Sequence, residues 1–460
     1  MEQYNFGLIG LGVMGRNFIM NVADNGYSAI GLARDPKKVE ALNKEGEGKP
    51  VYGTRDMKEF VNKLETPRII MLLVTAGDAV DSVINNLIPL VSEGDLIIDG
   101  GNSFYSDTDR RYADLKKRNI HFIGSGVSGG SKGARFGPSI MPGGDKEAYS
   151  LVEPIFKAVA AKVNGEPCVA HMGNVSAGNY VKMVHNGIEY GLMQLIAEVY
   201  DVLKKGIGLS NTLLHQTFDG WNQSRLQSFL IEITADIFSR KDDLTSEYLV
   251  DMILDKAKQK GTGKWTSQNA MDLGTPVPSI DAAVTMREIS AFKNLRKDLD
   301  KSTANEPLSI SVENVENALY TAFICTYAQG MAQLKEASAE YNYDLNLATI
   351  SKIWRGGCII RAALLEDMYK AYNSNPDLEH MLADSIFANH INENIEGLRK
   401  VVSFMISKGL PAMCLSTSLA YIDAMRSDSL PMNLVQAQRD HFGEHTYERI
   451  DREGIFHYDW

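Results

Sequence analysis

The sequence is poor in cysteine, in long apolar runs and in clustered basic charge. Its four cysteines are widely spaced and include no CxxC pair, so neither a disulfide framework nor a cysteine-based metal site is expected: Cys168, Cys325, Cys358 and Cys414. The sequence has no uninterrupted apolar run of about 18 residues and no basic segment ahead of an apolar one, which argues against membrane spanning and secretion. We expect reduced thiols, no metal and a cytoplasmic location.

The chain is acidic and long. Its formal net charge is −11 at pH 7 and its isoelectric point is near 5.4. This charge argues against general binding to nucleic acid or to anionic membranes, so an anionic ligand has to be met by a local group of basic side chains. With 460 residues, 44% of them hydrophobic, the chain can fill at least two cores.

A glycine-rich turn near the N-terminus predicts a dinucleotide site. The apolar run 6–9 precedes the turn, and a helical pattern follows it over 16–23. In such a unit the first glycine permits a tight turn, the second lets the backbone approach a pyrophosphate, and the third allows close packing of helix on strand. The residues expected to line the cofactor are Gly10, Leu11, Gly12, Val13, Met14 and Gly15.

Strand-like apolar runs that alternate with helical patterns indicate a parallel sheet. They occupy residues 6–10, 28–33, 68–74, 95–99 and 121–126. Two glycine-rich segments, 99–102 and 124–130, are expected to close two of these strands, at the sheet edge where open α/β folds bind ligands. An ordinary turn would explain either segment alone, but two of them beside the nucleotide turn favour a site.

Long helical patterns replace the strands after about residue 177. We therefore expect a Rossmann-like α/β domain over residues 1–176, an all-helical domain over 177–434 and a C-terminal tail over 435–460. The segments 191–195 and 330–334 are expected to begin two similar helices, each leading to an asparagine-containing turn and a later tryptophan. This similarity suggests an internal duplication, and a chance match between helical sequences is the alternative.

One predicted helix presents an amine, an imidazole, an amide and a carboxylate on a single face. These groups fall at i, i+3, i+4 and i+7, and they belong to Lys182, His185, Asn186 and Glu189. Met183, Val184 and Ile188 take the other face and are expected to pack. Such a face can move protons, whereas a plain solvated helix face is the alternative.

Three further segments carry groups that bind oxyanions: 258–265, Arg287 and 438–445. In the first, glycines expose backbone N–H groups between Lys260 and Thr262, which suits a phosphate, although a solvated turn is the ordinary explanation. The last segment opens a stretch from Arg439 to Trp460 that mixes histidine, arginine and aromatic residues. This composition favours an arm that docks on another surface over a loose tail.

Together these segments resemble the long-chain, decarboxylating 6-phosphogluconate dehydrogenases of the β-hydroxyacid dehydrogenase superfamily, over essentially the whole chain. The resemblance rests on GLGVMGRN (10–17), DGGN (99–102), GVSGG (126–130), GPSIMPGG (137–144), KMVHNGIEYG (182–191), ILDKAKQKGTGKW (253–265) and QRDHFGEHTYERID (438–451). The KGTGKW segment and the tail set this family apart from its sister dehydrogenases.

The resemblance implies oxidation of C3 of 6-phosphogluconate by a nicotinamide, loss of C1 as carbon dioxide, and formation of ribulose 5-phosphate, a step of the pentose phosphate pathway. It implies that Lys182 is the general base and Glu189 the general acid. The residues implied to orient the sugar acid are Asn102, Ser128, Gly129, Gly130, His185 and Asn186. Those implied to bind its phosphate are Tyr190, Lys260, Thr262, Arg287, Arg439 and His445.

In the family, the equivalents of Arg439 and His445 come from the tail of the other subunit, so the resemblance also implies a homodimer. A small departure lies between them. Glu444 stands where the family usually has a small residue, beside the substrate-binding histidine.

The cofactor residues depart further from the family pattern. NADP is the implied cofactor, and besides the glycine turn the implied contacts are Ala33, Arg34, Asp35, Val74, Thr75, Ala76 and Asn102. Arg34 can pair with a 2′-phosphate, but Asp35 stands where a carboxylate often holds the free ribose hydroxyl of NAD. Thr75 replaces an expected lysine. NADP comes first on family grounds, and NAD or dual use stays open.

Two rival functions are a β-hydroxyacid dehydrogenase acting on a different hydroxy acid and a catalytically silent nucleotide-binding protein. The first would not need the basic residues of all three oxyanion segments together. The second should have lost Lys182 or Glu189, and the sequence retains both.

Overall fold

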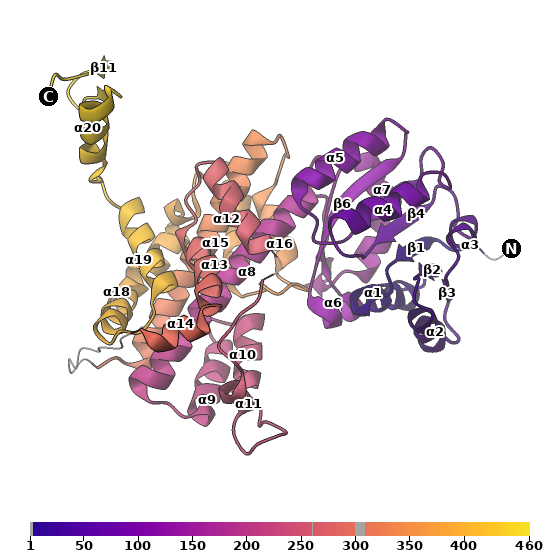
Figure 1. Ribbon diagram of the computed structural model, residues 1–460, viewed down its shortest axis with the longest axis horizontal. Helices are drawn as coiled ribbons and strands as arrows, with labels where there is room; N and C mark the ends of the chain where they lie inside the picture. The colour runs from indigo at the N-terminus through magenta and orange to yellow at the C-terminus, as the bar shows by residue number, and fades with distance from the viewer. Residues whose placement is uncertain (1–2, 260, 300–308) are drawn as a thin grey trace.

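The computed structural model describes residues 3–259, 261–299 and 309–460. Figure 1 shows an α/β part at the N-terminal end, a helical part in the middle, and a C-terminal segment that projects from the helical part. This arrangement confirms the predicted fold class. Within the described ranges no helix has both the length and the apolar character needed to cross a membrane.

The α/β part is built on one seven-stranded sheet in the order β3-β2-β1-β4-β5-β6-β7. The strands are β1 (Phe6–Ile9), β2 (Ala29–Leu32), β3 (Val51–Thr54), β4 (Ile69–Leu72), β5 (Leu96–Asp99), β6 (His121–Ser128) and β7 (Ser139–Gly143). Neighbouring strands are parallel except β7, which runs antiparallel to β6. The sequence patterns predict neither β3 nor β7.

Helices cover both faces of this sheet, which is why β1, β2, β4 and β5 are buried along their whole length. These helices are α1 (Val13–Asp24), α2 (Pro36–Glu45), α3 (Met57–Asn62), α4 (Asp78–Leu87), α5 (Tyr105–Lys116), α6 (Gly130–Phe136) and α7 (Lys146–Val159). One face packs around Phe18 and Phe156, and the other around Phe60 and Leu87. A short hairpin of β8 (Lys162–Val163) and β9 (Glu166–Pro167) ends this part.

The helical part begins with α8 (Ala177–Asp201), which a π-helical turn over Val202–Ile207 extends. It continues with α9 (Asn211–Asn222), α10 (Phe229–Ser239), α11 (Leu249–Met252), α12 (Thr262–Asp272), α13 (Pro278–Ser290), α14 (Lys293–Asp298), α15 (Val312–Glu340), α16 (Leu347–Trp354), α17 (Leu364–Ser374), α18 (Ser385–Ser407) and α19 (Met413–Met425). The tail holds α20 (Met432–Gly443) and a hairpin of β10 (Tyr447–Glu448) and β11 (Ile455–Phe456).

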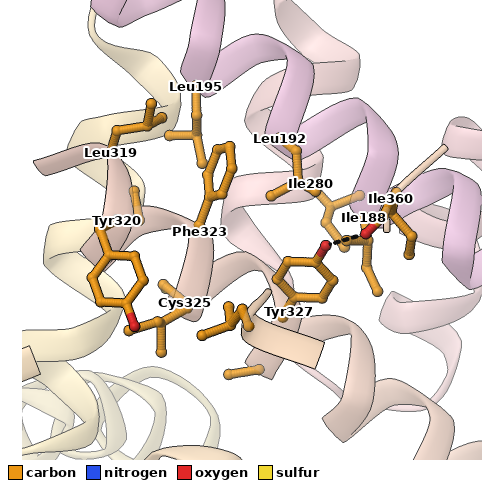
Figure 2. Close-up of a cluster of buried hydrophobic side chains, with 14 of the residues drawn as sticks. Ile188, Leu192, Leu195, Ile280, Leu319, Tyr320, Phe323, Cys325, Tyr327 and Ile360 are labelled. Carbon is orange, nitrogen blue, oxygen red and sulfur yellow. Dashed lines mark hydrogen bonds between the residues drawn. The ribbon is translucent and has the colours of Figure 1, made fainter. Parts of the chain in front are cut away.

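The two longest helices, α8 and α15, form the centre of the helical core. Figure 2 shows Leu192 and Leu195 of α8 in the same buried cluster as Phe323 and Tyr327 of α15, and the Tyr327 hydroxyl donates a hydrogen bond of 2.6 Å to the carbonyl of Ile360. Each of the two helices is buried along most of its length, so both lie inside the helical part.

The prediction that Gly191 and Gly330 begin helices is wrong, because both lie inside long ones. Each makes room for the opposite helix: a Cβ atom on Gly191 would lie 2.6 Å from Thr326, and one on Gly330 would lie 2.5 Å from Ile188. This reciprocal packing agrees with the duplication hypothesis, which stays a prediction.

A buried carboxylate on α8 caps another helix. The Oε1 and Oε2 atoms of Glu198 accept hydrogen bonds of 2.9 Å from the backbone N–H groups of Cys414 and Leu415 in the first turn of α19, and Gln194 donates to Oε1 at 3.0 Å. Glu198 is 2% exposed. Burial raises the pKa of its carboxyl to about 7, against the lowering effect of these donors.

Substitution Glu198→Gln should alter how stability depends on pH. Because the folded pKa of about 7 lies above the ordinary value of 4.5, the fold favours the protonated carboxyl, and stability falls as pH rises through this interval, by up to about 3 kcal/mol. Glutamine does not titrate. The melting temperature of the variant relative to wild type should therefore rise between pH 4.5 and pH 7.

The matched control is Glu336→Gln, which changes an exposed glutamate of α15. Its melting temperature should follow that of wild type at every pH. Parallel melting curves for wild type and Glu198→Gln across the interval would contradict the assignment.

Candidate active site

Close packing of α8 on the sheet creates the centre of the site. The predicted glycine loop 124–130 is partly wrong, because β6 continues to Ser128 and Gly124 and Gly126 lie inside the strand. A Cβ atom on Gly126 would lie 2.4 Å from Cβ of Lys182, and one on Gly178 would lie 2.3 Å from the carbonyl oxygen of Gly124. These glycines therefore let the helix backbone approach the strand, which buries Lys182 to 6% exposure.

Lys182 sits in a continuous hydrogen-bond network. Its Nζ donates to Oδ1 of Asn186 at 2.6 Å and lies 3.2 Å from Nδ1 of His185. Asn186 Nδ2 donates to Oγ1 of Thr262 at 3.2 Å, and Nε2 of His185 lies 3.2 Å from Oγ of Ser128. The structure thus brings together residues from β6, α8 and α12. The expected packing face of Met183, Val184 and Ile188 is confirmed as buried.

Burial pushes the two predicted proton-transfer groups toward their neutral forms. It lowers the pKa of the Lys182 amine, against the opposing charge of Glu189. It raises the pKa of the Glu189 carboxyl, against the charges of Lys182 and Arg287. Burial, with the Lys182 charge, also holds the pKa of His185 well below its ordinary value. An amine that can accept a proton and a carboxyl that can donate one thus lie on the same helix face.

Arg287 lies on the ring of Tyr190, beside the start of α12, which carries Thr262. The guanidinium carbon of Arg287 lies 3.3 Å from the ring centroid of Tyr190, and a Cβ atom on Gly263 would lie 2.3 Å from the same ring. Arg287 is half-buried, and within the described ranges no carboxylate forms an ion pair with it. A cation in this position favours an anionic ligand. Lys260, predicted to join this group, lies outside the described residues.

The loop after β6 carries the next predicted residues. Gly129 and Gly130 have φ values of +113° and +62°, which favour glycine, and a Cβ atom on Gly129 would lie 2.5 Å from the carbonyl oxygen of Gly357. The backbone N–H of Ile359 donates to Oγ of Ser128 at 3.4 Å. The segment 356–359, more than 200 residues later in the sequence, therefore packs on this loop.

Sequence reasoning missed this supporting segment. Trp354, noted only as part of a repeat, lies with its ring centroid 5.6 Å from that of His185 and at 78° to it. Cys358 is fully buried close to Lys182, and burial raises the pKa of its thiol to about 12 against the charge of the lysine. No local pattern points to these residues, because they reach the site only through long-range packing.

The three glycines of the turn after β1 have different surroundings. Gly10 has a φ of +108°, and a Cβ atom on it would lie 2.4 Å from the carbonyl oxygen of Leu73. A Cβ atom on Gly15 would lie 1.9 Å from the carbonyl oxygen of Gly10, whereas one on Gly12 would meet nothing within 4 Å. Gly12 is the N-cap of α1, which has no side-chain cap and no acidic residue in its first turn. Open space before an uncapped helix N-terminus fits a pyrophosphate.

The other predicted cofactor residues follow neighbouring strands at the same sheet edge. Leu11 is buried, Val13 is exposed and Met14 is half-buried. Residues 33–35 follow β2, Val74, Thr75 and Ala76 follow β4, and the exposed Asn102 follows β5. The carboxylate of Asp35 accepts a hydrogen bond of 3.0 Å from the backbone N–H of Lys37 and so caps α2.

The tail lies away from this site. Arg439 lies on α20 and His445 follows it, and Figure 1 shows α20 projecting from the helical part. The buried carboxylate of Asp440 folds the tail on itself: it accepts hydrogen bonds of 2.9 Å from Nδ1 of His457 and from Nε1 of Trp460. The structure therefore does not bring Arg439 and His445 to the Lys182 of their own chain. Glu444, with a φ of +54°, ends α20 between them.

A buried arginine joins the loops after β4 and β5. Nη1 of Arg111 lies 3.3 Å from Oδ2 of Asp99, its Nε donates to Asp81 at 2.8 Å, and its Nη2 donates to the carbonyl of Gly77 at 3.1 Å. The Ser103 hydroxyl donates to Asp99 at 2.6 Å. The network thus holds together the segments that follow β4 and β5, at the sheet edge where the predicted cofactor residues lie.

Three comparisons set the chain beside the same known proteins. Residues 178–460 match the family described as 6-phosphogluconate dehydrogenase, C-terminal domain, and residues 5–173 match the NAD binding domain of 6-phosphogluconate dehydrogenase. The NADP(+)-dependent, decarboxylating 6-phosphogluconate dehydrogenase of Bacillus subtilis (strain 168) is 51% identical, and the decarboxylating enzyme of Escherichia coli (strain K12) is 48% identical, each with 100% of both chains covered.

A solved structure gives the same result. Plasmodium falciparum 6-phosphogluconate dehydrogenase, studied in its apo form, with its cofactor NADP+ and with its substrate 6-phosphogluconate, has a TM-score of 0.95 and 45% identity to this chain. The match covers 99% of this chain and 100% of that one.

Replacing Arg111 by methionine should cost on the order of 3–5 kcal/mol of stability, because it leaves the fully buried Asp99 carboxylate unpaired. The matched control is Arg110→Met. The side chain of Arg110 is 50% exposed and pairs with the same Asp81, so its loss should cost no more than about 1 kcal/mol. Urea unfolding of both variants measures the difference, and equal losses would refute the role of burial.

Proposed function

The chain belongs to the 6-phosphogluconate dehydrogenase family, and from that premise we propose how its own residues carry out the reaction. The site oxidises 6-phospho-D-gluconate and releases carbon dioxide to give D-ribulose 5-phosphate, with NADP+ as the hydride acceptor. The observation that carries the residue roles is the buried Lys182 beside Glu189 on one face of α8. The comparisons favour this function over a dehydrogenase for another hydroxy acid.

Lys182 acts as the general base. Its lowered pKa leaves it able to take the proton of the C3 hydroxyl while the hydride leaves C3. The resulting ammonium then donates to the new C3 ketone, and that ketone takes up the electron pair and the ammonium proton when the C1 carboxylate departs as carbon dioxide. Asn186 and His185 orient the amine, because both lie within hydrogen-bond distance of Nζ.

Glu189 acts as the general acid. Loss of carbon dioxide leaves an enediol. It becomes the ketose when its C1, which was C2 of the substrate, takes a proton and its C2 hydroxyl returns a proton to the Lys182 amine. The raised pKa of Glu189 supports a protonated carboxyl at this stage. Glu189 is half-buried, with 22% of its side chain exposed, so it can be protonated again from solvent after each turnover.

The remaining predicted residues bind the substrate or the cofactor. Ser128, Gly129, Gly130 and Asn102 orient the sugar acid, and Tyr190, Lys260, Thr262 and Arg287 bind its phosphate. NADP+, when bound, supplies the hydride acceptor. Its pyrophosphate would lie on the open turn at Gly12 and the N-terminus of α1, with Arg34 close to the 2′-phosphate.

We also propose a homodimer in which the tail of one subunit completes the site of the other. The projecting α20 supports this, since Arg439 and His445 lie away from their own site. So do exposed apolar side chains on the tail, such as Phe442 at 74% and Ile455 at 74% exposure.

The domain limits at residues 176 and 434 and a cytoplasmic location are also part of the proposal. The four free, buried cysteines support the cytoplasmic location.

The function is tested by the initial rate of nicotinamide reduction with 6-phosphogluconate, with released carbon dioxide trapped in parallel. One carbon dioxide per nicotinamide reduced is expected. Lys182→Ala should lower kcat by about 10²–10⁴-fold while NADP+ still binds, because the base is lost. Reduction without carbon dioxide would contradict the decarboxylation, and near-normal turnover of Lys182→Ala would remove the lysine from the mechanism.

The pH profile separates the acid from the base. Activity should rise as Lys182 loses its proton and fall as Glu189 loses its proton, so wild type should give a bell-shaped curve. Glu189→Gln should lower the maximum and remove the limb at high pH. A high-pH limb that persists in this variant would assign the proton to another group.

Mixed dimers test the tail. Lys182→Ala subunits have an intact tail, and subunits with His445→Ala have an intact Lys182, so each homodimer should be impaired. Coexpression should produce hybrids with one complete site and restore up to about one quarter of wild-type activity, as expected for random pairing in a two-fold dimer. Hybrids no more active than the two parents would show that the tail serves its own chain.

A further inference from the structure

The same dipeptide, Arg-Asp, follows two neighbouring strands of the sheet. Arg34-Asp35 follows β2 and Arg55-Asp56 follows β3, and the strands are parallel with Leu32 opposite Thr54. The backbone N–H of Ala33 donates to the carbonyl of Thr54 at 3.3 Å. Both arginines therefore lie at the carboxyl edge of the sheet, where the cofactor residues lie.

The two aspartates are engaged by the helices that follow. Asp35 caps α2 through the backbone N–H of Lys37 at 3.0 Å. Asp56 caps α3 by accepting from the backbone N–H groups of Lys58 at 2.8 Å and Glu59 at 3.3 Å. Each carboxylate binds a helix N-terminus. In the part of the chain that the structure describes, neither forms an ion pair with the arginine beside it.

The Arg55 side chain lies over the turn between β2 and α2. Its Nε donates to the backbone carbonyl of Arg34 at 3.3 Å. Both arginines are exposed. Within the described ranges the structure gives no protein partner to the terminal nitrogens of either guanidinium. These nitrogens are donors in a planar fork, the geometry that recognises phosphate.

We propose that Arg55 is a specificity residue that binds the 2′-phosphate of NADP+ together with Arg34. This inference rests on the proposed function. It explains how a chain with Asp35 and the uncharged Thr75 at the cofactor edge uses a phosphorylated dinucleotide: the Asp35 carboxylate is held by the helix, and a second cation comes from the next strand. The 2′-phosphate then lies between two guanidinium groups.

Equilibrium binding of two cofactor fragments tests the proposal without turnover. Titration calorimetry with 2′,5′-ADP and with 5′-AMP isolates the effect of the 2′-phosphate. Arg55→Ala should bind 2′,5′-ADP about tenfold more weakly, as expected for the loss of one charge-assisted contact. It should bind 5′-AMP as wild type does, and Arg55→Lys should fall between wild type and Arg55→Ala for 2′,5′-ADP.

Lys44→Ala is the matched control, because it removes one exposed positive charge from the far end of α2. It should leave both affinities within twofold of wild type. If Arg55→Ala binds 2′,5′-ADP like wild type, or loses affinity equally for both fragments, the proposal is overturned. If wild type binds 2′,5′-ADP no better than 5′-AMP, the choice of NADP in the proposed function fails as well, which distinguishes the two failures.

Discussion

The close contact between α8 and the sheet is the constraint on which the rest of this molecule depends. Glycines on β6, with Gly178 of α8, remove the side chains that would hold helix and strand apart. The helix can then bury Lys182 at the edge of the sheet, where its amine loses water and its pKa falls. A larger residue at any of these positions would move the amine away from Ser128 at the end of β6.

The helix α8 also contacts the rest of the helical part. Its middle packs on α15 in the helical core, and its last third caps α19 through Glu198. Because α19 precedes the tail, α8 links the sheet, the proton-transfer pair and the helix before the projecting segment. Precise placement of catalytic groups requires such support, because small displacements are costly to rates.

Sequence patterns predicted the elements whose signals are local and strong. Short apolar runs between helical patterns identified β1, β2, β4 and β5, and helical periodicity identified the reactive face of α8. Weak signals failed: β3 reads Val-Tyr-Gly-Thr and β7 reads Ser-Ile-Met-Pro-Gly, neither of which is a continuous apolar run. Similarity between two segments predicts helix starts at Gly191 and Gly330, whereas both glycines lie inside helices and allow them to approach each other.

The sequence by itself determined the order of the α/β and helical parts, the glycine turn at Gly10 and the spacing that places Lys182 and Glu189 on one face, because these depend on residues adjacent in the chain. Only the tertiary structure decided that Trp354 contacts His185. It also decided that Arg55 lies over the turn at Arg34. These contacts join residues from different elements, and which elements meet depends on how their buried surfaces pack, which no local pattern encodes.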